Sequence, residues 1–147
     1  MKRLFFPAVI ILSVVFAPLA LARNEILNFS VEEAMASEKF AQEVGDSVKF
    51  YFGGQSHPAV EKKFGSFSSN KKTNAFNKSD MEACRWALYS ALVSLRDRAL
   101  REGGNAVVGI KSIYRNNTFE SDTEFQCGAG AFVAGVALDG RVVKLKQ

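Results

Sequence analysis

The sequence is poor in the residues that most enzyme and metal sites use. Its 147 residues include one histidine and two cysteines, and no C-x-x-C pair occurs, which excludes the common zinc and thiol-redox motifs. It also has no G-x-x-x-x-G-K-[ST] loop to hold nucleotide phosphates, and no serine or cysteine in a recognisable nucleophile motif. We therefore expect a protein without catalytic residues and without a cofactor.

A strong excess of charge is lacking as well. Lys and Arg number 19 and Asp and Glu 15, which gives a formal net charge of +4. Nucleic-acid-binding domains usually show a denser basic surface than this. The composition therefore gives no support for a nucleic-acid partner.

The longest apolar run lies at the start of the chain. Two basic residues precede an apolar run from Leu4 to Phe16, and Ala20-Leu21-Ala22 follow, which is the layout of a secretory signal peptide cut after Ala22. The alternative is an uncleaved anchor, but the run is short for a bilayer span. Cleavage would lower the formal net charge from +4 to +2. It would leave a periplasmic or secreted chain with no membrane span.

The sequence then divides into three predicted parts. Residues 1–22 are the signal peptide, residues 23–46 an N-terminal helical segment and residues 47–147 a single α+β domain. Ser30 and Glu33 form a capping box in the helical segment. A mature chain of about 125 residues is the right size for one domain with one core.

A long helix after Ser79 is the strongest secondary-structure signal. Ser79 and Glu82 form a capping box, and Gly103-Gly104 marks the end. Apolar residues at helical spacing make one stripe, which we expect to pack on a sheet. The stripe comprises Cys84, Leu88, Ala91, Leu92, Leu95 and Ala99.

Alternating segments on both sides of this helix predict strands. They cover residues 47–54, 105–114, 124–138 and 141–145. Asp139-Gly140 predicts a two-residue hairpin turn between the last two. The expected fold is α+β, with one long helix packed on a mainly antiparallel sheet in the order β-α-β-β-β and with short N-terminal helices.

Cys84 and Cys127 fall on the two faces that are predicted to meet. Cys84 belongs to the apolar stripe of the helix, and Cys127 shares one side of its strand with Phe125 and Ala129. An exported compartment is oxidising, so an even number of cysteines favours a disulfide. Two unrelated buried cysteines are the alternative.

Basic and aromatic residues alternate in the segment from Glu61 to Ser79. Such a mixture could bind an anionic envelope component, and the alternative is a solvated loop whose aromatic rings pack on the domain. The candidate partner-binding loop comprises Lys62, Lys63, Phe67, Lys71, Lys72, Phe76 and Lys78.

Two weaker candidates remain. His57, the sole histidine, could ligate a metal or transfer a proton, although a lone histidine is usually a surface residue without such a role. Gly128 and Gly130 leave one side of their predicted strand almost bare, so a second copy of the chain could approach closely there. Packing by residues 26–29 would cover this glycine-rich face equally well.

The stretches GGNAVVGIKSIYRNN and CGAGAFVAGVALDGRVVKL resemble two known groups. One is the YbjQ-like family of small proteins described as heavy-metal-binding, which implies ring-like oligomers. The other is the Rcs envelope-stress sensor lipoprotein, which implies a similar fold with disulfides and carries over Cys127. The resemblance covers roughly Val48 to Leu145 as architecture.

KFYFGGQSHPAV and NKKTNAFNKSDMEAC also resemble small exported bacterial proteins that are often labelled "excinuclease ATPase subunit". The phosphate-binding loop that an ATPase of this kind needs is absent. The sequence thus predicts a non-catalytic exported domain that binds or senses an unknown envelope component or protein. A periplasmic protein that binds a metal or small anion is one alternative, and a secreted hydrolase, whose polar cleft would form only on folding, is another.

Overall fold

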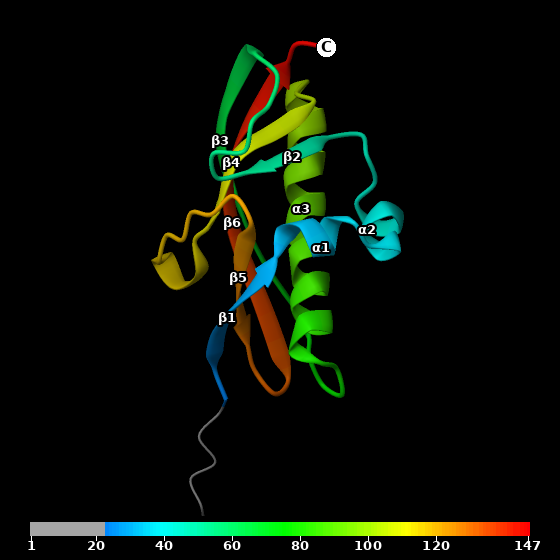
Figure 1. Cartoon of the computed structure of the whole chain (residues 1–147), viewed down its shortest axis with the longest axis vertical. Coiled ribbons are helices and arrows are strands. Elements are labelled where there is room, and N and C mark those ends of the chain that lie inside the picture. Colours follow the sequence, from blue (N-terminus) through cyan, green and yellow to red (C-terminus); the bar gives the residue numbers. More distant parts are fainter. Residues whose placement is uncertain (1–22) are drawn as a thin grey trace, which may run out of the picture.

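In the computed structural model, one long helix lies along one face of a six-stranded sheet (Figure 1). The structure describes residues 23–147, so the predicted signal peptide at 1–22 lies outside the described residues. The elements are β1 (Glu25–Ser30), α1 (Val31–Met35), α2 (Glu38–Glu43), β2 (Lys49–Phe52), β3 (Val60–Asn74), α3 (Asp80–Glu102), β4 (Ala106–Ser112), the 3-10 turn η1 (Tyr114–Asn116), β5 (Glu124–Ala129) and β6 (Val133–Leu145).

The sheet is organised around β6. On one edge β6 pairs with β3 along its whole length, and on the other edge it pairs first with β5 and then with β4. β1 extends the sheet beyond β5, and β2 extends it beyond β4. Among the strands of residues 23–147, only β2 and β4 pair in parallel. The prediction of an α+β fold with one long helix on a mainly antiparallel sheet is confirmed.

The expected β-α-β-β-β order lacks two strands. β1 lies in the segment that was predicted to be helical, where it pairs with β5 from Glu25 opposite Ala129 to Ser30 opposite Glu124. β3 occupies the stretch that was predicted to be a loop. The loop prediction is wrong because the backbone of residues 60–74 finds a continuous partner in β6.

The hairpin predicted at Asp139-Gly140 is also wrong, since β6 runs straight through both residues. Asp139 lies opposite Ser68 on one side and Lys111 on the other, and Ser68 Oγ donates a hydrogen bond of 2.8 Å to the Asp139 carboxylate. The chain reverses earlier, between the end of β5 at Ala129 and the start of β6.

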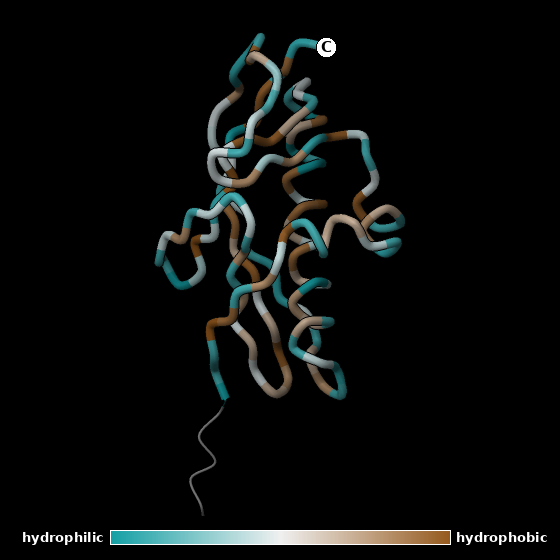
Figure 2. The backbone as a smooth tube through the Cα atoms, viewed as in Figure 1, coloured by the Kyte–Doolittle hydropathy of each residue, from teal (hydrophilic) through white to brown (hydrophobic). Residues whose placement is uncertain are grey.

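α3 has the predicted ends and the predicted buried stripe. The Ser79 hydroxyl accepts a hydrogen bond of 3.1 Å from the Glu82 N–H, and Gly103 ends the helix with φ of 84°, a left-handed conformation that favours glycine. Figure 2 shows apolar segments recurring along the helix between polar ones. All six residues of the stripe are buried: Cys84, Leu88, Ala91, Leu92, Leu95 and Ala99.

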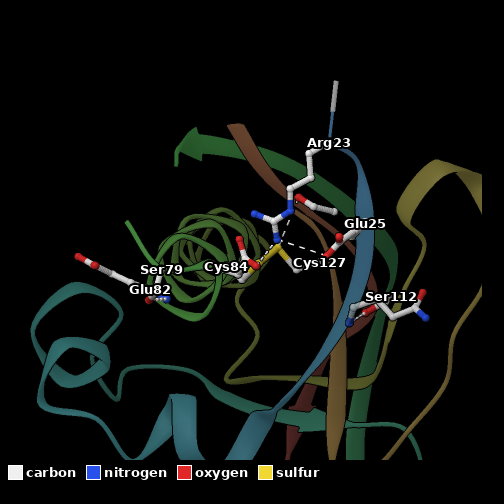
Figure 3. The surroundings of a disulfide bond; sticks show 10 residues. Arg23, Glu25, Ser79, Glu82, Cys84, Ser112 and Cys127 are labelled. Carbon is white, nitrogen blue, oxygen red and sulfur yellow. Dashed lines mark hydrogen bonds and ion pairs between the residues drawn. A yellow bond between two sulfur atoms is a disulfide. The ribbon is translucent and has the colours of Figure 1, made fainter. Parts of the chain in front are cut away.

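The predicted disulfide between Cys84 and Cys127 is confirmed (Figure 3). It joins the second turn of α3 to β5, with 5.8 Å between the two Cα atoms. Both cysteines are fully buried within the main core. The bond therefore links the helix to the sheet covalently inside the core.

The segment before β2 is packed on α3. Val31 and Ala34 of α1 are buried in the main core, and the Tyr89 hydroxyl donates a hydrogen bond of 2.9 Å to the Ala34 carbonyl. Farther along α3, Arg96 donates to the Val44 carbonyl at 2.8 Å. Within residues 23–147, no helix combines the length and apolar character needed to cross a bilayer.

Candidate functional site

β3 places the candidate basic and aromatic residues on opposite faces of the sheet. Lys71 lies opposite Val136, which belongs to the main core, whereas Lys72 lies opposite Gly135 on the other face. Lys62 and Phe67 lie on the α3 side with Lys71, and the Arg98 guanidinium of α3 lies 3.9 Å from the Phe67 ring centroid. Lys63 lies on the outer side with Lys72. The seven candidate residues therefore do not form one surface.

The last two candidates, Phe76 and Lys78, lie in the connection between β3 and α3. Lys78 Nζ donates to the Asn74 carbonyl at 3.0 Å. The Phe76 ring stacks on Phe132 in the β5–β6 turn, with centroids 5.8 Å apart and planes 11° apart. We call the exposed residues Phe76, Phe132 and Val133 the aromatic tip.

A groove of about 320 Å³ opens on the face of the sheet that α3 does not cover. Gly128 and Gly135, directly opposite each other on β5 and β6, form its floor. We call it the glycine-floored groove. It is lined by Arg23, Asn24, Lys72, Tyr114, Gly128, Gly130, Ala131, Phe132, Val133 and Gly135.

Tyr114 lies over both floor glycines. A Cβ atom at Gly128 would overlap the Tyr114 ring, and one at Gly135 would come within 3.3 Å of Tyr114 Cε2. The turn that positions this ring has left-handed backbone at Arg115 (φ 53°) and Asn116 (φ 60°), which costs about 1–3 kcal/mol per residue. At these two glycines the face is thus covered by a side chain of the same chain, whereas residues 26–29, the segment expected as an alternative cover, pair with the edge of β5 as part of β1.

Two cations line the groove. Arg23 forms hydrogen-bonded ion pairs with Asp80 at the start of α3 and with Glu25 on β1 (Figure 3). The hydrogen bonds to Asp80 and then to Glu25 raise the pKa of Arg23 above its ordinary value, so this side chain keeps its charge. Lys72 has no ion pair with any residue of 23–147. Lys72 therefore supplies the charge that is not already neutralised.

His57 lies at a second cavity of about 310 Å³, which Lys63 and Arg141 also line. Its Nδ1 is 2.8 Å from the Pro58 carbonyl, and its ring packs against Tyr51 with centroids 5.5 Å apart. In the described part of the chain, no group of three or more His, Cys, Asp or Glu side chains is placed to hold a metal ion.

Of the residues that line the groove, sequence reasoning singled out only Lys72, Gly128 and Gly130. It missed Arg23, Tyr114 and Phe132 among the others. Asn116 was the available signal for the turn that follows Tyr114, because asparagine tolerates left-handed backbone. Nothing local distinguishes Arg23 or Phe132, which reach the groove through pairing of distant segments.

No family model, no curated protein and no solved structure matches the chain. The functional argument therefore rests on the geometry of the groove and the aromatic tip.

Proposed function

We propose that the protein is a non-catalytic exported domain that binds an anionic component of the cell envelope in the glycine-floored groove. The observation that carries this proposal is the position of Lys72, a cation without an ion pair in the described chain, beside a ring held over two glycines. The strained turn at Arg115 and Asn116 supports it, because strained backbone is concentrated at functional sites.

The lining favours an anion that carries an apolar or flat part. Lys72 can donate to a phosphate or carboxylate oxygen, while Tyr114 and Phe132 offer ring faces to the rest of the ligand. Arg23 is paired with Asp80 and Glu25, so its charge is already neutralised and Lys72 is left to bind the anion. A groove lined by one lysine that is unpaired within residues 23–147 and by the two rings of Tyr114 and Phe132 suits a phosphate ester better than an inorganic ion, because the rings can contact the organic part of the ester.

Binding of a small anion elsewhere is the second candidate function. Lys63 and Arg141 converge with His57 on the second cavity. Arg141 lies against the backbone of Gly109, where a Cβ atom would clash with its guanidinium. A small anion bridging Lys63 and Arg141 would fit this arrangement.

The test is an amide chemical-shift titration of the exported protein with glycerol 3-phosphate as probe. Shifts are expected at Gly128, Gly135 and Tyr114. Lys72→Gln should raise the apparent Kd about tenfold, because it removes a charge-assisted hydrogen bond. Lys71→Gln is the matched control, since it removes the same charge one residue away on the opposite face.

If both substitutions raised the Kd equally, binding would depend only on the net charge of the protein. That result would refute the proposal that the anion binds in the glycine-floored groove. Shifts confined to residues around Lys63 and Arg141 would favour the second cavity instead.

A further inference from the structure

The aromatic tip exposes more apolar surface than the fold requires. Phe76, Phe132 and Val133 are 55%, 67% and 49% exposed. The two rings stack only on each other, from two different connections, and the Ala75 N–H donates to the Phe132 carbonyl at 2.8 Å to hold these connections together. A fixed, exposed aromatic pair is typical of a contact surface.

Basic side chains surround this tip. Lys72 and Arg23 line the same groove as Phe132 and Val133, and Lys78 belongs to the connection that carries Phe76. Arg23 is paired with the carboxylates of Asp80 and Glu25, so the positive charge beside the tip comes from Lys72 and Lys78. An apolar tip next to two lysines that have no ion pair within residues 23–147 matches the two layers of an anionic membrane surface, where acyl chains lie beneath negative headgroups.

The tip also lies at the end where the described chain starts. Figure 1 shows the β5–β6 turn, the β3–α3 connection and the start of β1 at the same end of the sheet. The apolar run from Leu4 to Phe16 precedes Arg23 in sequence and so is joined to the domain at this end. While the predicted signal peptide is attached, the aromatic tip is therefore at the end of the domain that is covalently joined to it.

We propose that the aromatic tip docks on an anionic lipid bilayer, with Phe76 and Phe132 at the level of the headgroups and upper acyl chains. Lys72 then receives a lipid phosphate in the groove, a step that rests on the proposed function. Phe76 does not line the groove, so the lipid contact and the anion contact can be separated by mutation.

The experiment is vesicle flotation of the exported protein. Wild type should float with phosphatidylglycerol vesicles and remain behind with phosphatidylcholine vesicles, and added salt should weaken the binding. Phe76→Ser should lower partitioning about tenfold. Leu100→Ser is the matched control, because Leu100 is 50% exposed near the opposite end of α3, and its partitioning should equal that of wild type. All samples should have the same intact mass, so that any N-terminal run contributes equally.

Four outcomes separate the two proposals. Loss of flotation in Phe76→Ser with unchanged glycerol 3-phosphate shifts at Gly128 supports both. Wild type that binds glycerol 3-phosphate but not phosphatidylglycerol vesicles overturns the membrane proposal and leaves the groove standing. If Phe76→Ser and Leu100→Ser reduced flotation equally, the proposal that the aromatic tip is the docking surface would be wrong. Binding of polyglutamate at the tip without flotation overturns the lipid as partner and favours an acidic protein.

Discussion

The two faces of the sheet are built for different purposes, and β6 contributes to both. Toward α3 it presents Val136, Leu138 and Val142, which are buried with the apolar stripe of the helix and the disulfide. Away from α3 it presents Gly135, against which the Tyr114 ring and the stem of Lys72 pack. Most buried apolar side chains lie on the inner face. Apart from a smaller buried cluster at Ala106, Val108, Val143 and Leu145, the outer face can therefore carry small, strained and charged residues.

Removing the disulfide should have the largest effect on the inner face. Cys84→Ala with Cys127→Ala opens a loop that spans 43 positions, which corresponds to about 4 kcal/mol of stability on the chain-entropy estimate. Urea unfolding measures this loss, and reductant should bring the wild type down to the double variant. A variant that unfolds at the wild-type midpoint without reductant would mean that the bond contributes nothing to the inner face.

Truncating one side chain of the stripe should have the next largest effect. Leu92 is fully buried in the main core, so Leu92→Ala should destabilise the fold by about 3 kcal/mol through lost burial and a residual cavity. Leu100→Ala, on the exposed side of the same helix, should change stability by less than about 0.5 kcal/mol. Similar losses in both variants would contradict the division between the two faces of α3.

A substitution in the groove floor should have a smaller effect on stability and a larger one on binding. Gly128→Ala places a methyl group in the Tyr114 ring, so the ring has to shift at a cost of about 1–2 kcal/mol. Glycerol 3-phosphate shifts should weaken at the same time. Gly54→Ala is the control, because its nearest neighbour is an ordinary 3.5 Å away. If Gly128→Ala bound glycerol 3-phosphate as wild type does, Tyr114 would not be part of the binding site.

α3 and its disulfide could be predicted because their signals are local. The Ser79–Glu82 cap, the glycine stop and the apolar stripe all agree, and they place Cys84 on the face that meets Cys127. Agreement among independent local signals is what makes a sequence prediction secure.

β3 could not be recognised because its sequence does not show the regular alternation of apolar and polar residues that predicts a strand. It is rich in Lys and Asn, which have low strand propensity. An irregular register between Lys63 and Gly65 places Phe64 and Phe67 on one face at a spacing of three. Pairing with β6, whose partner residues lie 59 to 85 positions away in sequence, decides its conformation. The same long-range pairing overrides the Asp139-Gly140 turn signal.

The groove was missed for a related reason. Its ring, floor and cation come from η1, two neighbouring strands and β3, and only the folded sheet brings them together. The candidate segment did contain Lys72. Lys72 cannot be distinguished from Lys71 until both are known to lie on a strand, where neighbouring side chains point to opposite faces.

The central position of β6 has a consequence for how the chain is made. β3, β4 and β5 all precede β6 in the sequence, and each pairs with it. During synthesis these strands have no completed sheet to join until β6 has emerged from the ribosome. The order of synthesis therefore delays closure of the sheet until its last and central strand has been made.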